Sequence, residues 1–213
     1  MPKRAACLLL ALLAAPSLTL AATPASQDFA DAVALRPDPV RGERLFVTCA
    51  GCHRADGRGN RDGSVPAIAG QHQRVLVRLL TDYRHARRWD PRMQHYAEAH
   101  VLPDMQAVAD VADHIAGLER GTNGGTGRGN RLQLGDALFK ERCASCHGQR
   151  GEGDAETLVP RIAGQHHAYL LRLFKEAAEG ARPSYPPDHI SLFQELGAER
   201  LDAIADAASR MQP

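Results

Sequence analysis

Two short cysteine motifs, repeated in the same context, constrain this chain of 213 residues more than any other feature. The first is CAGCH, from Cys49 to His53, and the second is CASCH, from Cys143 to His147. The segments VPAIAGQH and VPRIAGQH follow them, and motif and segment both recur after 94 residues (143 − 49 and 160 − 66). An internal repeat of this kind predicts two similar domains in tandem.

The arrangement Cys-x-x-Cys-His is the attachment signature of c-type haem. Two thiols must reach the two vinyl groups of one porphyrin, and the adjacent histidine is then delivered to the iron. The motifs therefore predict two covalently bound haem c groups. The predicted attachment residues are Cys49, Cys52, Cys143 and Cys146, and the predicted iron ligands beside them are His53 and His147. Taken alone, each cysteine pair would also fit a redox dithiol or half of a zinc site.

The composition favours a buried prosthetic group. Aromatic residues make up only 5% of the chain, which is little for two separate small cores, and a porphyrin in each domain would supply the missing aromatic surface. Apolar residues recur at helical spacing in the segments 73–83 and 167–177, and helices are also predicted over 42–48, 103–118, 135–142 and 197–211. No segment has a convincing strand pattern. We therefore predict an all-α fold in which short helices enclose each haem.

The N-terminus has the pattern of an export signal. A basic start is followed by an apolar run from Ala5 to Ala15 and by small residues near Ala21, which predicts a signal peptide over residues 1–21. The rest is predicted to divide into an N-terminal extension over 22–36, a first domain over 37–120, a flexible linker over 121–131 and a second domain over 132–213. We expect a periplasmic location. No later segment is long enough to span a membrane, and peripheral association with a membrane stays open.

The charge balance excludes one class of partner. The chain has 26 basic and 25 acidic residues, and removal of residues 1–21 takes away Lys3 and Arg4, so the mature balance is 24 − 25 = −1. A nearly neutral chain lacks the basic excess that nucleic-acid binding requires. One basic cluster has two interpretations. Its positive charge either neutralises charge on haem propionates or at the domain interface, or it steers an acidic partner toward the protein. Its members are Arg84, Arg87, Arg88 and Arg92.

Three features together resemble the class I cytochromes c, and more closely the diheme cytochrome c4 family: the G-x-x-L-F lead-in, the Cys-x-x-Cys-His motif and the P-x-I-A-G-Q segment. The resemblance covers nearly all of the mature chain. It implies two tandem class I cytochrome c domains, each wrapped around one covalent haem c, and periplasmic electron transfer. It also implies that the carbonyl groups of Pro66 and Pro160 accept the Nδ1 hydrogens of the ligand histidines, which raises the basicity of these ligands. The residues implied to pack on the porphyrins are Phe46, Ile68, Phe139 and Ile162.

The second iron ligand of the first domain is predicted to be Met93. This residue lies in WDPRMQHY, between the middle and closing helices, where class I cytochromes c place their methionine ligand. Met105 lies in the closing helix, too late in the chain for that segment. His95 and His100 lie close enough to Met93 in the sequence to remain rival ligands. The histidines that follow the P-x-I-A-G-Q segments are expected at the surface or against haem propionates; they are His72, His166 and His167.

The second domain departs from the methionine pattern. Its closing helix aligns with that of the first domain at an offset of 96 residues (203 − 107), which places His189 opposite Met93. The only methionine of this half is Met211, at the end of the last helix. We therefore predict His53/Met93 at the first iron and His147/His189 at the second, whereas two His/Met sites are usual in the cytochrome c4 family. An exposed His189 with an open iron is the alternative.

These features predict a carrier that passes single electrons between a redox protein donor and a redox protein acceptor, such as a dehydrogenase, an oxidase or a reductase. Two alternatives stay open. A diheme oxidoreductase enzyme would exchange the ligand of its second haem, and an electron-transfer subunit would work only inside a larger complex. Outside the two motifs the mature chain has no cysteine, which excludes a catalytic haem with a cysteine ligand.

Overall fold

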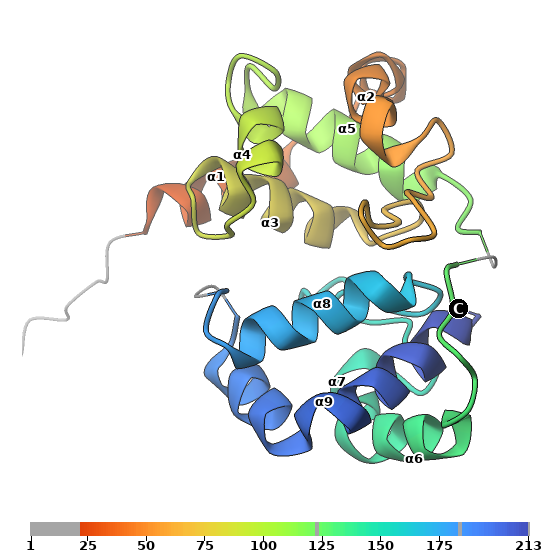
Figure 1. Cartoon of the computed structure of the whole chain (residues 1–213). Helices are drawn as coiled ribbons and strands as arrows, with labels where there is room; N and C mark the ends of the chain where they lie inside the picture. The colour runs from red at the N-terminus through yellow and green to blue at the C-terminus, as the bar shows by residue number, and fades with distance from the viewer. Residues whose placement is uncertain (1–21, 122–123, 183–184, 213) are drawn as a thin grey trace, which may run out of the picture.

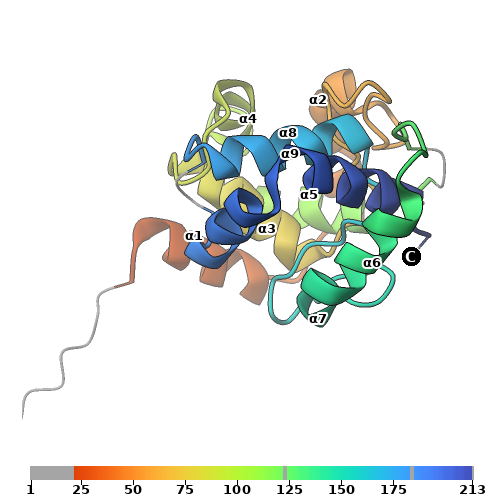
Figure 2. The same cartoon turned by 60° about the horizontal axis from the view of Figure 1, so that its bottom comes forward.

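The computed structural model describes residues 22–121, 124–182 and 185–212, so the predicted signal peptide lies outside the described residues. The regular structure of these residues is helical, apart from one isolated bridge between Asp154 and Val159. The prediction of an all-α fold is confirmed. Two halves lie one above the other, with α3 of the first half and α8 of the second on facing sides (Figure 1). Turning the molecule brings the second half in front of the first (Figure 2).

The first half contains the helices α1 to α5 around one core. Their bounds are Pro24–Ala34 (α1), Pro39–His53 (α2), Gln73–Arg84 (α3), Pro91–Ala97 (α4) and Met105–Gly117 (α5). α2 and α5 pack closely on each other, and α1 and α3 cover the same apolar interior. Among the buried residues of this core are Phe46, Leu76, Val77, Leu102 and Val108. α1 falls in the predicted N-terminal extension and contributes its buried Ala32 to the core.

The second half repeats this arrangement with one change. Its helices are Leu132–Arg142 (α6), Ala144–His147 (α7), His167–Ala178 (α8) and Pro187–Arg210 (α9), and α9 packs on both α6 and α8. α9 is bent at Gly197, whose φ of 71° interrupts the helix. The part before the bend corresponds in the repeat to α4, and the part after it corresponds to α5. The two ligand segments, which lie between the predicted helices, are therefore themselves helical in both halves.

The glycine that opens each G-x-x-L-F segment lets two helix backbones touch. A Cβ atom on Gly42 would overlap the carbonyl oxygen of Asp110, and one on Gly135 would overlap the carbonyl oxygen of Ala203. α2 therefore crosses α5, and α6 crosses α9, at a distance that only glycine permits. Since each cysteine motif lies at or just beyond the end of the first of these helices, the crossing also sets where the motif lies.

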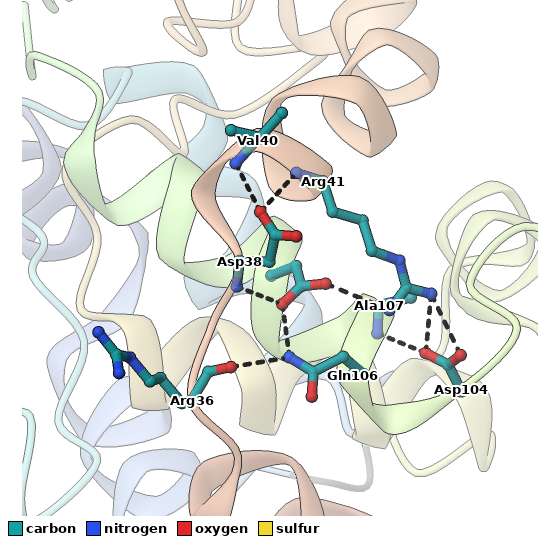
Figure 3. Close-up of polar contacts among 8 residues, drawn as sticks. Arg36, Asp38, Val40, Arg41, Asp104, Gln106 and Ala107 are labelled. Atoms are coloured by element: carbon teal, nitrogen blue, oxygen red, sulfur yellow. Dashed lines mark hydrogen bonds and ion pairs between the residues drawn. The ribbon is translucent and has the colours of Figure 1, made fainter.

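In each half, a buried aspartate of the closing helix binds the backbone of the segment that precedes the motif helix. Asp110 is fully buried and accepts hydrogen bonds from the backbone N–H of Asp38 at 2.8 Å and from the Gln106 amide at 2.7 Å. Arg41 Nη1 lies 3.3 Å from the same carboxylate. Asp38 in turn caps the start of α2 by accepting from the N–H groups of Val40 and Arg41 (Figure 3). The closing and opening helices are thereby tied together at one polar point.

Asp206 plays the same part in the second half. It accepts hydrogen bonds from the N–H groups of Gly127 at 2.9 Å and Gly129 at 2.7 Å, and Arg210 pairs with it at 2.9 Å. The N–H of Gly125 donates to Nδ1 of His166, in the same half, at 2.9 Å. The sequence predicts a flexible linker over 121–131, but residues 124–130 are held against the second half by these bonds.

One strained residue follows the first cysteine motif. Arg54 has φ 68° and ψ 160°, a backbone region that is essentially restricted to glycine. Its counterpart in the second half, 94 residues later, is Gly148, with φ 79° and ψ 162°. The Arg54 side chain is 64% exposed, and its 3.7 Å pairing with Asp56 contributes little because water screens it. The first half therefore carries a local strain that the second half lacks.

We expect Arg54→Gly to raise the free energy of unfolding by about 1 kcal/mol. Relief of a strain of about 1–3 kcal/mol outweighs the greater backbone freedom of glycine, which costs about 0.5–1 kcal/mol. Thermal unfolding of the haem-loaded protein, followed by circular dichroism, measures the effect. Arg44→Gly, at an exposed helical position of α2, is the matched control and should lower the stability by about 1 kcal/mol. A lower melting temperature for Arg54→Gly would contradict the strain argument.

Candidate haem sites

The end of α2 presents the first motif. Cys49 is half-buried, Cys52 is exposed, and neither is in a disulfide. The His53 side chain is buried, and its Nδ1 lies 3.0 Å from the carbonyl oxygen of Pro66. Because a carbonyl can only accept, Nδ1 carries the hydrogen and Nε2 keeps a lone pair for a metal. The contact that the resemblance implies for this histidine is confirmed.

A cavity, partly open to solvent, lies beside this histidine. It is lined by the motif residues Cys49, Cys52 and His53, and also by Ile68 and Met93. The rival residues His95, His100 and Met105 do not line it. Phe46 does not line it either; its ring packs in the core, 5.0 Å from the ring of His114. The fold thus brings the predicted ligand pair His53 and Met93 to one cavity.

Met93 is positioned by the start of a short helix. Asp90 caps α4 by accepting from the N–H groups of Arg92 at 3.0 Å and Met93 at 3.3 Å, so Met93 lies in the first turn. At the other end, Arg84 of α3 donates to the carbonyl groups of Ala97 and Leu102. Of the predicted basic cluster, Arg84 thus anchors the ligand segment, whereas Arg88 and Arg92 line the cavity.

The second motif lies at the junction of α6 and α7. Cys143 is half-buried, Cys146 is exposed, and neither is in a disulfide. His147 Nδ1 lies 3.0 Å from the carbonyl oxygen of Pro160, which repeats the first site and confirms the implied contact. The ring of His189, from the first part of α9, faces His147 with 6.2 Å between centroids and 89° between planes.

Two aromatic rings lie close to His189, one on the same helix and one on the segment before it. Phe193 lies one turn along α9, with ring centroids 5.7 Å apart, and Tyr185 lies on the preceding segment at 6.1 Å. Phe193 also packs on Phe174 of α8 at 4.8 Å, which joins the ligand segment to the core. His189 is half-buried, so it does not have the exposed position of the alternative prediction.

Burial controls the protonation of both motifs. It lowers the pKa of His53, His147 and His189, which keeps these imidazoles neutral with a lone pair available. Burial also raises the pKa of Cys49 and Cys143 to about 11. A redox dithiol requires a lowered thiol pKa, so these pairs do not suit that chemistry. Nor does either cysteine pair lie in a cluster of three or more His, Cys, Asp or Glu residues within the described part of the chain, as a structural zinc site with four protein ligands would require.

The two halves are joined by a reciprocal pair of glutamines. Gln71 accepts from the backbone N–H of Arg161 and donates to its carbonyl, both at 2.9 Å. Gln165 does the same with Ala67, at 3.0 Å and 2.8 Å. Each glutamine closes its P-x-I-A-G-Q segment and binds the residue just after the proline of the other copy. The interface therefore has approximate two-fold symmetry.

The next residue in each copy extends the same interface. His72 Nε2 lies 2.8 Å from the carbonyl oxygen of Glu152, and His166 Nε2 lies 2.7 Å from that of Arg58. For His72 and His166, the expectation of a position at the surface or against propionates is wrong. His167 does not take part in the interface contacts of these two and pairs with Asp202. The sequence signal was available: the same polar pair, Gln-His, follows a glycine in both copies.

The second half also completes the wall of the first cavity. Tyr169 and Arg172 of α8, together with Arg182, line the cavity that contains His53. Arg88 of the first half lies among them, donating to the Tyr83 hydroxyl at 2.7 Å and lying 3.5 Å from the Tyr169 hydroxyl. The first site is therefore built from both halves of the chain.

Two helical domains, each with a Cys-x-x-Cys-His motif whose histidine is oriented by a proline carbonyl, define the class of diheme c-type cytochromes. The chain belongs to the cytochrome c family, which matches residues 39–119 and 132–198, and it is a cytochrome c4-like member. It therefore binds two haem c groups covalently and transfers electrons. Within the described segments, no helix combines the length and apolar character needed to cross a bilayer.

Similar proteins agree on this class. Cytochrome c4 of Pseudomonas aeruginosa is 29% identical over 153 residues, covering 68% of this chain and 73% of that protein. The thiosulfate dehydrogenase electron acceptor of Stutzerimonas stutzeri is 31% identical over 170 residues, covering 75% and 77%. The crystal structure of reduced cytochrome c4 from Pseudomonas stutzeri has the same fold, with a TM-score of 0.72 at 21% identity, and the match covers 83% of this chain and 100% of that chain.

Replacing Gln71 and Gln165 by alanine should separate the two domains. Each change leaves one backbone N–H and one carbonyl without their interdomain partner, which costs about 1–3 kcal/mol. We expect the double variant to unfold in two steps and to be cleaved faster by protease within residues 121–130. Gln133→Ala, exposed on α6, is the control and should change stability by less than about 0.5 kcal/mol. If the double variant unfolded in one step at the wild-type temperature, Gln71 and Gln165 would not be what holds the two domains together.

Proposed function

We propose that the protein is a periplasmic diheme cytochrome that carries single electrons from one redox protein to another. The observation that carries this proposal is that each motif histidine lies near a second side chain able to bind iron: Met93 lines the same cavity as His53, and the ring of His189 lies 6.2 Å from that of His147. Two protein ligands complete the coordination of a haem iron and leave no open position for a substrate. The bound haem supplies the reversible one-electron change of its iron.

The first haem would be attached through Cys49 and Cys52 and ligated by His53 and Met93. All four line one cavity, and the neutral His53 directs Nε2 away from the bond that its Nδ1 makes. Met105 instead packs against the core. These placements support the His/Met pair over its rivals.

The second haem would be attached through Cys143 and Cys146 and ligated by His147 and His189. Metal–imidazole bonds are about 2.0 Å long, so an ion bound between two imidazoles holds the ring centroids about 6 Å apart. The measured separation of 6.2 Å supports this pair. Met211 follows α9 at its far end and packs against the core.

Buried arginines would hold the carboxylates of the first haem. Arg88 contacts only tyrosine hydroxyls, and among the described residues it has no acidic partner. Arg182 pairs with Glu176 through Nε at 2.6 Å, but its Nη1 atom is buried and finds no hydrogen-bond partner among the described residues. Because a buried polar group without a partner is costly, the free Nη1 atom of Arg182 suits a propionate in the cavity, and so does Arg88, which lines the same cavity without an acidic partner among the described residues. This favours the first of the two interpretations of the basic cluster.

Partner and location follow from the relatives and from the N-terminus. One relative is named as the electron acceptor of a thiosulfate dehydrogenase, so we infer that this chain also takes electrons from a dehydrogenase. The acceptor would be a further redox protein, such as an oxidase or a reductase. The predicted signal peptide over residues 1–21 supports export to the periplasm.

The two ligand sets should give unequal potentials. A methionine ligand favours ferrous iron and raises the potential, whereas a second imidazole donates more strongly and stabilises ferric iron. The second haem would therefore have the lower potential. An electron would run downhill from the C-terminal to the N-terminal domain.

Met93→Ala should abolish the weak band near the red end of the visible spectrum that a ferric iron–thioether bond produces. The reason is that no other methionine lines the first cavity. Absorption spectra of the oxidised protein before and after the change measure it. Met105→Ala is the matched control and should keep the band. Persistence of the band in Met93→Ala would transfer the ligand role to another residue.

His189→Met should raise the lower of two resolved potentials by on the order of 100 mV, within the span over which axial ligands tune haem potentials. The higher potential should stay nearly unchanged, since Met93 is untouched. A redox titration followed by absorption measures both steps. Ready binding of carbon monoxide to the second haem of the wild-type protein would show an open iron and favour the oxidoreductase alternative.

A further inference from the structure

Two exposed histidines face each other at the end of α4, outside the haem cavity. His95 lies in the last turn of α4, and His100 lies in the loop that follows. Their Nε2 atoms are 3.4 Å apart, and their ring centroids are 4.5 Å apart. Neither residue lines the cavity that contains His53 and Met93.

The separation of the two nitrogens is informative. A distance of 3.4 Å is long for a hydrogen bond, whose donor and acceptor are usually about 2.9–3.0 Å apart. Two nitrogens bound to one tetrahedral zinc ion, at about 2.0–2.1 Å each, are separated by about 3.3–3.4 Å. The ring centroids, 4.5 Å apart, are closer than in an ideal tetrahedral site. Both side chains are exposed, so a small rotation of the rings would bring the two nitrogens into that geometry.

A carboxylate lies behind one of these rings. Glu98 Oε2 is 3.6 Å from His100 Nδ1, on the side of the ring away from Nε2. In metal sites such a carboxylate receives the Nδ1 hydrogen, sets the tautomer and raises the basicity of the ligating nitrogen. The 3.6 Å separation is longer than a hydrogen bond, and its shortening on metal binding would give the same arrangement here and leave the Nε2 lone pair of His100 directed toward His95.

We propose that His95 and His100 bind a divalent transition-metal cation of the zinc type, oriented by Glu98 and completed by water. A square-planar Cu²⁺ site would need adjacent nitrogens only about 2.9 Å apart, so the observed spacing suits a tetrahedral ion better. With two protein ligands in place of the four of a structural zinc site, binding is weaker and exchangeable.

A cation at this position would restrain the ligand segment. His95 is two residues after Met93 on the same short helix, and His100 belongs to the loop whose neighbouring carbonyl groups Arg84 binds. Bridging the two histidines cross-links the end of α4 to that loop. This consequence rests on the proposed role of Met93, whereas cation binding itself does not.

Zinc binding to the mature, haem-loaded, tag-free protein tests the site. Titration calorimetry in a non-coordinating buffer should show one site, and His95→Ala or His100→Ala should weaken it by at least ten-fold. Glu98→Gln should weaken it by about 10–100-fold, as for other carboxylates behind metal-bound histidines. His85→Ala is the control, because His85 already pairs with Asp28 at 2.8 Å, and it should leave binding unchanged.

Two results would overturn the proposal. One is the absence of zinc binding to the wild-type protein, and the other is unchanged binding in the double variant His95→Ala/His100→Ala, which would place the ion elsewhere. The restraint has a separate readout: zinc should raise the temperature at which the red band is lost, in the wild type only. If Met93→Ala keeps that band, the ligand assignment fails while the zinc titration still decides the cation site.

Discussion

The hydrogen bond between each motif histidine and a proline carbonyl thirteen residues later is the contact on which both domains depend. To make it, the intervening chain folds back on the end of the motif helix, and the N–H of Gly59 or Gly153 binds the carbonyl of the histidine itself. This loop forms one side of the haem site and sets the tautomer of the ligand. The helix crossing at Gly42 or Gly135 then sets where the motif lies against the closing helix.

The same loop also forms the interface between the domains. Ala67, directly after Pro66, pairs through its backbone with Gln165, and Arg161, directly after Pro160, pairs with Gln71. Each domain therefore holds the loop that orients the iron ligand of the other. Since Arg182 and Tyr169 also line the first cavity, the two sites are not independent modules joined by a tether.

The two halves differ most in the segments that contain the proposed second iron ligands. The interface and the proline contacts are repeated closely, whereas the ligand segment is a separate helix in one half and the first part of a bent helix in the other. Met93 and His189, the proposed iron ligands, occupy these segments, so the proposed ligation differs between the halves while their fold is alike. Arg54 and Gly148 are a second difference, in which one copy keeps a strained backbone that the other relieves.

Much of this protein follows from its sequence alone, because the determining signals are local. The cysteine motifs require attachment and a ligand within five residues, and the apolar periodicity of the segments 73–83 and 167–177 places α3 and α8. The offset between the copies also pairs Met93 with His189 without knowledge of the fold. What only the tertiary structure decided lies in contacts between distant residues. The Gln71–Arg161 and Gln165–Ala67 pairs join positions 90 and 98 residues apart, and Asp206 holds residues 127 and 129 in a segment whose glycines predict flexibility. A glutamine or an aspartate has the same local pattern whether it faces water or a backbone across an interface, so only the packing of the two halves determines which one it meets.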